Sequence, residues 1–143
     1  MRALLDVNVL IALLDAGHAM HRRATAWLTQ QAPQGWASCP LTQNGAVRIM
    51  SQPAYPTPRP AALVAQRLAM ACAAPEHRFW VADVSLLGAD VIDWQRLLGH
   101  RQVTDAYLLA LAVRHQGQLA TFDQRISPDL VYGATAEHLQ VIE

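Results

Sequence analysis

The sequence predicts an α/β fold in which a central, mainly parallel sheet is flanked on both faces by helices. Two patterns lead to this prediction. Short, wholly apolar runs alternate along the chain with longer segments whose apolar residues recur at helical spacing. Several of these runs are followed by a polar residue, as expected where buried parallel strands end at one edge of a sheet. Such alternation implies right-handed crossovers that place helices on both sides of the sheet.

The composition is that of one compact domain covering residues 1–143. The 11 basic residues, all of them arginine, balance the 11 acidic residues. An anionic partner must therefore be held by local charges or metal ions rather than by overall charge. The two cysteines lack zinc-ligand spacing and are expected to be reduced. No apolar run is long enough to span a bilayer, so we expect a cytoplasmic protein with no membrane contact.

Each expected element has a local reason. The strands are short apolar runs bounded by turn residues, whereas the helices begin at capping residues or proline and end near glycine or proline. A loop with four prolines, residues 53–60, separates the third and fourth helices, because proline fits neither a helix interior nor a central strand. The expected strands are residues 3–5, 36–39, 79–81, 119–122 and 139–142, and the expected helices are residues 7–15, 20–31, 40–51, 60–74, 86–98 and 104–115.

Polar residues follow the first three strands. The first strand ends at Asp6, which is suited either to a cap or to a site at the sheet edge, and Asn8 is the expected cap of the helix that follows. The second strand leads into a helix that directs Gln43 toward the same edge. Asp83 follows the third strand and is expected to cap a turn rather than to join an acidic site.

The stretch from Thr104 to Asp123 is the one around which the chain is organised. Thr104 is the expected helix cap, and Asp105 falls in the first turn, where the helix dipole favours an anion. The helix is apolar around most of its circumference and therefore must be buried. Gly117 ends it, and the short strand that follows delivers Asp123 at its carboxyl end.

Three carboxylates are thus expected at one edge of the sheet: Asp6, Asp105 and Asp123. Close carboxylates repel, so at neutral pH they require a compensating cation or a raised pKa. A cluster of oxygen ligands without cysteine or histidine selects Mg²⁺ or Mn²⁺. Such an ion can bind phosphate oxygens, activate a water and stabilise a leaving group. The pattern therefore favours metal-assisted phosphodiester hydrolysis.

Four motifs, in this order and at this spacing, resemble the PIN domain, and more narrowly the VapC ribonuclease toxins of bacterial VapBC toxin-antitoxin modules. They are Leu4-Leu5-Asp6-Val7-Asn8-Val9-Leu10-Ile11, Pro40-Leu41-Thr42-Gln43-Asn44-Gly45-Ala46-Val47-Arg48-Ile49, His100-Arg101-Gln102-Val103-Thr104-Asp105-Ala106-Tyr107-Leu108-Leu109-Ala110 and Thr121-Phe122-Asp123. The resemblance covers almost the whole chain. It implies a PIN-like three-layer sandwich with metal-dependent endoribonuclease activity. It also implies a homodimer that a cognate VapB antitoxin blocks.

The resemblance also assigns roles to single residues. The three carboxylates match the metal-binding acids of the family, and Asn8 and Thr121 match polar residues that hold those acids in place. Asn8 and Thr121 are equally suited to act only as local caps. Arg48, Arg101 and Arg125 lie beside the acidic motifs and are candidate phosphate contacts, although each is also suited to a solvated position at the surface.

The sequence departs from the family pattern at Gln43, where many members have glutamate. A glutamine oxygen can ligate a cation or orient a water, but it brings no charge and cannot act as a base. Weaker metal binding is therefore expected, with Mg²⁺ arriving together with RNA. Two alternatives remain. One is a catalytically weakened binding module that docks antitoxin, RNA or both. The other is a metal-dependent phosphatase or nuclease acting on small substrates or DNA.

Overall fold

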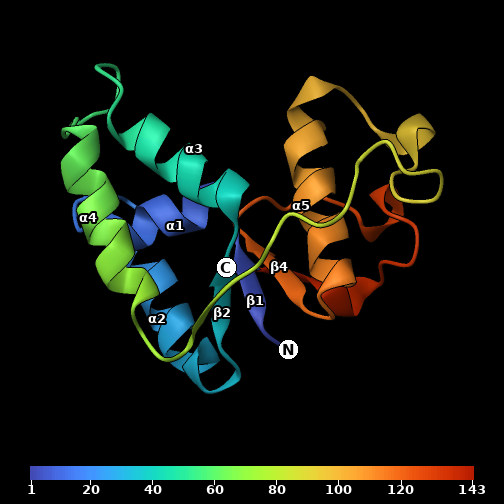
Figure 1. The fold of residues 1–143 in the computed structure, drawn as a ribbon, viewed down its shortest axis with the longest axis horizontal. Coiled ribbons are helices and arrows are strands. Elements are labelled where there is room, and N and C mark those ends of the chain that lie inside the picture. The colour runs from blue at the N-terminus through green and yellow to red at the C-terminus, as the bar shows by residue number, and fades with distance from the viewer.

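The computed structural model describes residues 1–143 and contains a five-stranded sheet in the order β3-β2-β1-β4-β5 (Figure 1). All four strand pairings are parallel. The strands are β1 (Ala3–Leu5), β2 (Trp36–Ser38), β3 (His77–Phe79), β4 (Gln118–Thr121) and β5 (Leu139–Val141). The predicted parallel sheet between helical layers is confirmed.

Five α-helices cover the sheet. Figure 1 shows α1 to α4 on one side of the strands and α5 on the other. Their bounds are α1 (Val7–Leu14), α2 (His21–Gln31), α3 (Pro40–Met50), α4 (Ala61–Cys72) and α5 (Val103–Arg114). None of these helices combines the length and the apolar character needed to cross a bilayer.

Two separate apolar cores form because neighbouring strand residues point to opposite faces of the sheet. Leu4 and Leu119 pack with α5 in one core, and Leu5 and Ala120 pack with α1, α3 and α4 in the other. Six of the twelve residues of α5 are buried, as its apolar circumference predicts. Gly117 is needed where the chain leaves α5, because a β-carbon there would lie 2.5 Å from the backbone oxygen of Arg2.

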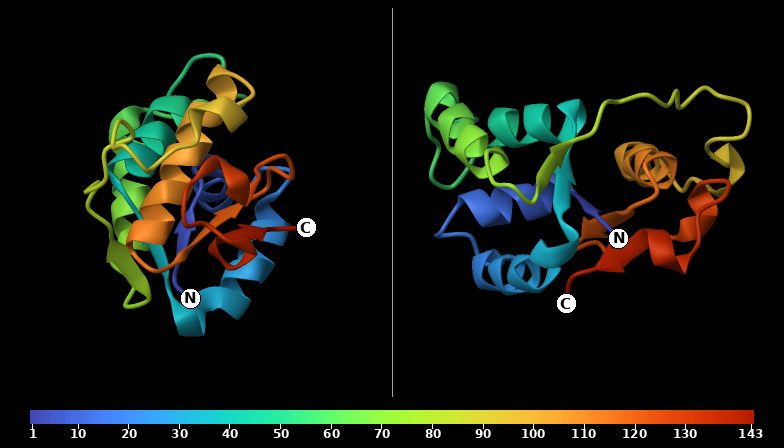
Figure 2. Two further views of the ribbon diagram at one scale, coloured as in Figure 1. Left: turned by 90° about the vertical axis from the view of Figure 1, so that its right-hand side faces the viewer. Right: turned by 60° about the horizontal axis from the view of Figure 1, so that its bottom comes forward.

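The prediction of a mostly helical segment over residues 86–98 is wrong. The segment contains turns and a single short 3-10 helix, Trp94–Arg96, and it runs along the molecule from β3 to α5 (Figure 2). Its apolar side chains do not share one buried face, since Leu87 and Leu98 are 81% and 88% exposed. Without such a face, a helix would gain little from packing.

Three smaller predictions also need correction. The third strand lies two residues earlier than expected, at His77–Phe79. Asn8 does not cap α1, because the cap is Asp6, whose side chain accepts a hydrogen bond from the Val7 amide. Thr104 does not cap α5, because a short 3-10 helix, His100–Gln102, runs directly into α5 at Val103.

Candidate active site

Two of the predicted acids lie at the carboxyl edge of neighbouring parallel strands. Asp6 follows β1, and its amide donates a hydrogen bond of 2.9 Å to the carbonyl oxygen of Ala120 in β4. Asp123 lies two residues beyond the end of β4. Asp105 comes from the first turn of α5, which packs against this part of the sheet. The order β2-β1-β4 at the centre of the sheet therefore accounts for the nearness of Asp6 and Asp123, and α5 adds Asp105.

Both oxygens of the Asp6 carboxylate accept hydrogen bonds inside the protein. Oδ1 accepts from the Val7 amide at 2.7 Å, and Oδ2 accepts from the hydroxyl of Thr121 at 2.7 Å. The residue is only 7% exposed. Burial raises the pKa of Asp6, the two hydrogen bonds lower it, and the charge of Asp123 raises it. Asp6 is therefore held in one orientation.

Thr121 links two of the acids. Its buried hydroxyl donates to Asp6 and also accepts a hydrogen bond of 3.1 Å from the backbone amide of Asp123. This is the position expected of a residue that holds the acids in place. Asn8, by contrast, is exposed at the surface of α1, and its side chain makes no hydrogen bond to any of the acids.

Asp105 is the acid whose charge is least compensated. Burial, followed by repulsion from Asp6 and Asp123, raises the pKa of Asp105 to about 6, and only the charge of Arg125 opposes this shift. No hydrogen bond or ion pair contributes to this balance. The three acids therefore interact electrostatically although they come from distant parts of the sequence.

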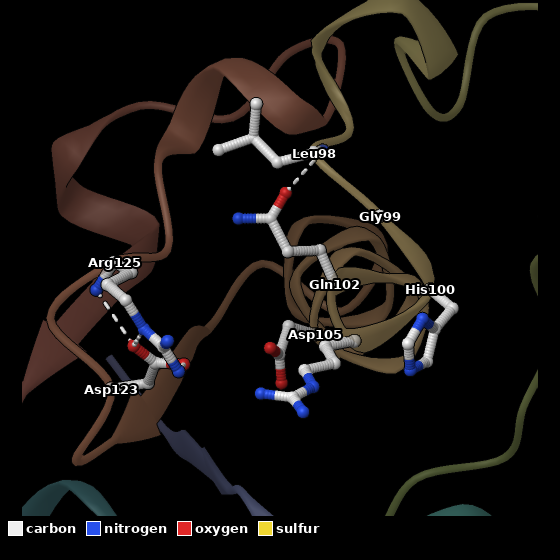
Figure 3. Close-up of a pocket in the computed structure, with 8 residues that line it drawn as sticks. Leu98, Gly99, His100, Gln102, Asp105, Asp123 and Arg125 are labelled. Atoms are coloured by element: carbon white, nitrogen blue, oxygen red, sulfur yellow. Dashed lines mark hydrogen bonds and ion pairs between the residues drawn. The ribbon is translucent and has the colours of Figure 1, made fainter.

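Asp123 is paired with Arg125, as Figure 3 shows. Arg125 donates through Nε to Oδ1 at 3.1 Å and through Nη2 to Oδ2 at 3.3 Å, and its backbone amide also donates to Oδ1. These contacts hold the pKa of Asp123 below its ordinary value. The Arg125 side chain is 79% exposed, so solvent screens this pair and the arginine can leave it at little cost.

A cavity of about 280 Å³ lies beside Asp105 and Asp123. One wall is the segment that leads into α5, and the opposite wall is Arg125 (Figure 3). The residues that line the cavity are Leu98, Gly99, His100, Arg101, Gln102, Asp105, Asp123 and Arg125. Arg101 and Arg125 thus line the same cavity as Asp105 and Asp123. Arg48 is exposed on α3 and does not line this cavity.

The chemistry of the acids fits a hard divalent cation, although their carboxylates do not converge on a single point. No three histidine, cysteine, aspartate or glutamate side chains lie close enough together to hold a metal ion. Three mutually repelling carboxylates, one of them with a pKa raised to about 6, are nevertheless what a hard cation would stabilise. Asp105 and Asp123 line the cavity, and the charge of Asp6 acts on Asp105, so these three residues are the candidate ligands.

Gln43 makes no hydrogen bond to the acids and does not line their cavity. Its amide nitrogen donates a hydrogen bond of 3.0 Å to Ser38, and the Ser38 hydroxyl is 2.7 Å from Nε2 of His77. Gln43 lines a separate groove between α3 and α4 that includes Val47 and Cys72. Its catalytic role therefore remains a prediction, and so does that of Arg48.

Asp83, the acid expected to cap a turn after the third strand, pairs with the end of α5. It lies 3.0 Å from Nε2 of His115 and 3.6 Å from Nε of Arg114. It therefore plays a structural part away from the three acids.

The cavity residues Leu98, His100 and Gln102 were not predicted as site residues. The only available signal was their position just before the helix that carries Asp105.

Fold and site together define a class of protein. Residues 3–129 match the PIN domain family, and the chain therefore belongs to it. The chain is 56% identical over 142 residues to Ribonuclease VapC44 of Mycobacterium tuberculosis strain H37Rv, a match that covers 99% of this chain and 100% of that protein. It is 44% identical over 129 residues to Ribonuclease VapC39 of the same strain, covering 89% and 92% of the two chains. Within the PIN domain proteins, it is a member of the VapC ribonuclease family.

Two solved structures share the fold. One is the structure of VapBC2 from Rickettsia felis bound to a DNA fragment from their promoter, with a TM-score of 0.63, 11% identity and full coverage of both chains. The other is VapC20 of Mycobacterium tuberculosis, described as a Sarcin-Ricin loop cleaving toxin, with a TM-score of 0.55 and 17% identity. It matches 81% of this chain and 85% of that one. At these identities the likeness concerns the fold alone.

Proposed function

We propose that this protein is a metal-dependent endoribonuclease toxin of a type II toxin-antitoxin module. The observation that carries the proposal is the convergence of Asp6, Asp105 and Asp123 at one edge of the sheet beside a polar cavity. The expected cofactor is Mg²⁺ or Mn²⁺, and the expected substrate is RNA. The family membership supports the ribonuclease activity, whereas the dependence on metal rests on the chemistry of the three acids.

Each residue has a distinct part in the proposed reaction. Asp6, Asp105 and Asp123 would hold the cation, which supplies Lewis acidity and an activated water when bound. Thr121 would hold the Asp6 carboxylate and the backbone of Asp123 in place through its two hydrogen bonds. Arg101 and Arg125, which line the cavity, would contact the phosphates of the bound strand.

The expected protein partners follow from the family. We propose a VapB-like antitoxin that inhibits this protein, and a homodimer as its assembly. The Rickettsia felis structure, named for a VapBC2 pair on promoter DNA, supports the search for such a partner. We expect the protein to act in the cytoplasm, where its RNA substrates are.

The position of Gln43 favours a second candidate function. Its amide nitrogen donates to Ser38 rather than to an acid, and its side chain contributes no negative charge. A catalytically weakened module that binds antitoxin or RNA would tolerate this arrangement. Retention of the three mutually repelling acids argues for the enzyme, because a chain that only binds has no need of them.

The deciding experiment is cleavage of total cellular RNA by purified protein free of antitoxin, with Mg²⁺, Mn²⁺ or EDTA. We expect discrete cuts that disappear with EDTA and in the Asp6→Asn variant. Circular dichroism on the same Asp6→Asn sample distinguishes loss of activity from loss of fold. If the wild type cuts no RNA while Gln43→Glu does, the weakened binding module is the correct function.

A further inference from the structure

The wall of the cavity opposite Arg125 contains Gln102, whose side chain is hydrogen-bonded to the backbone of a nearby residue. The Leu98 amide donates a hydrogen bond of 2.8 Å to Oε1 of Gln102. Gly99 permits this turn, since its φ of +156° is rarely adopted by other residues. The short 3-10 helix at His100–Gln102 then leads directly into α5. The amide of Gln102, which lines the cavity, is thus oriented by this hydrogen bond.

The orientation of this amide is determined by chemistry. A backbone N–H can only donate, so the oxygen of Gln102 must face Leu98 and the NH₂ group must face the other way. In Figure 3 the nitrogen points into the space between Leu98 and Arg125. No acceptor in the protein receives a hydrogen bond from it. The two N–H groups of the Gln102 amide are therefore available to donate to a molecule that binds in the cavity.

The surroundings of this donor suit a nucleotide base. The side chain of Leu98, which is 88% exposed, offers an apolar surface against which the face of a base can lie. Arg125 still has Nη1 free of Asp123, because that pair uses only Nε and Nη2. Asp105 and Asp123 line the same cavity. A base held here would place its phosphate close to Asp105 and Asp123.

We propose that this cavity is a base-recognition subsite in which Gln102 selects a keto base, guanine or uracil, next to the cleaved phosphate. This inference rests on the proposed ribonuclease function. Guanine and uracil carry an exocyclic oxygen that accepts a hydrogen bond, whereas adenine and cytosine carry an amino group at the corresponding position. An amino group facing the NH₂ of Gln102 would leave two donors opposed and unpaired. Turning the amide over to accept would break its hydrogen bond to the Leu98 amide.

The test uses RNA oligonucleotides that differ only in the base next to the cleavage site. For the wild type we expect kcat/KM to favour guanine over adenine and uracil over cytosine by about tenfold, the discrimination of one ordinary hydrogen bond. In Gln102→Glu, one carboxylate oxygen still accepts from Leu98 and the other replaces the NH₂ group as an acceptor. The keto-to-amino ratio should then reverse. The ratio cancels any effect of the added charge that is common to all four bases.

A matched control is Gln124→Glu, which adds the same charge at an exposed position next to Asp123 without altering the Gln102 amide. Its rates are free to change, but its keto-to-amino ratio should equal that of the wild type. A wild-type ratio near one, or a ratio that Gln102→Glu leaves unchanged, would overturn the inference.

A second measurement separates this inference from the proposed function. Binding of the same oligonucleotides, made with a 2′-deoxy nucleotide at the cleavage site, is followed by fluorescence anisotropy without divalent metal. If no RNA is cut but binding follows the keto-to-amino preference and its reversal in Gln102→Glu, the enzyme proposal fails and the subsite stands. If RNA is cut but neither kcat/KM nor binding depends on the base, the subsite is refuted.

Discussion

Replacing Thr121 by valine tests whether its hydroxyl positions the acids. Valine keeps the volume of this fully buried side chain and removes only the hydroxyl, together with its bonds to Asp6 and to the amide of Asp123. A hydrogen bond to a charged group contributes about 1.5–3 kcal/mol, and here the carboxylate left behind is itself buried. We therefore expect the free energy of unfolding to fall by about that amount, with a decrease in Tm of roughly 5–10 °C.

The functional consequence should exceed the loss of stability. Residues that orient metal ligands typically change metal affinity or activity by about 10- to 100-fold. Thr121→Val should therefore need a higher Mg²⁺ concentration for half-maximal RNA cleavage, measured well below its Tm. Thr121→Ser is the matched control, since it retains the hydroxyl and loses only a methyl group, which costs about 1 kcal/mol. It should be destabilised but keep the wild-type Mg²⁺ dependence.

Either of two results would refute this reasoning. Wild-type stability of Thr121→Val in urea unfolding with EDTA would mean that the hydroxyl bonds make no net contribution. Equal Mg²⁺ dependence of Thr121→Val and Thr121→Ser would mean that the hydroxyl does not position the acids for cation binding.

Three further predictions concern other parts of the molecule. The Tyr55 hydroxyl holds the pKa of buried Asp15 below its ordinary value, so this contribution to stability is present above the unfolded-state pKa of about 4 and lost as pH falls through the folded-state value. Asp15→Asn should lower the free energy of unfolding at pH 7 by about 1–3 kcal/mol. In urea titrations at decreasing pH, the free energy of unfolding of this variant should fall less between pH 7 and pH 3 than that of the wild type. Arg101→Ala and Arg125→Ala should each weaken RNA binding and reduce its salt slope by about one; an unchanged slope would exclude that arginine as a phosphate contact. Gln43→Glu should raise Mg²⁺ affinity in calorimetry, and two tight Mg²⁺ sites in the wild type would contradict the predicted weakness.

The edge of the sheet was predictable because it depends on local patterns. An apolar run followed by Asp6, and a second run followed by Asp123, are enough to place both residues once the strands are parallel. The segment at residues 86–98 was not predictable in the same way. Its apolar residues suggested a helix, but whether they are buried depends on how the chain crosses from β3 to α5, and Leu87 and Leu98 remain exposed.

The length of each side chain explains why the positions of some polar groups follow from the sequence and those of others do not. An aspartate carboxylate lies only two bonds from the backbone, so strand order alone fixes Asp6 and Asp123 near each other. Gln43 and Gln102 have three side-chain torsions, and a single local partner decides where their amides point. For Gln43 that partner is Ser38, which accepts a hydrogen bond from the amide nitrogen. For Gln102 it is the backbone of Leu98, which turns a donor into the cavity. Motif spacing can therefore predict the carboxylates, whereas the direction of a long polar side chain depends on contacts that only the folded chain provides.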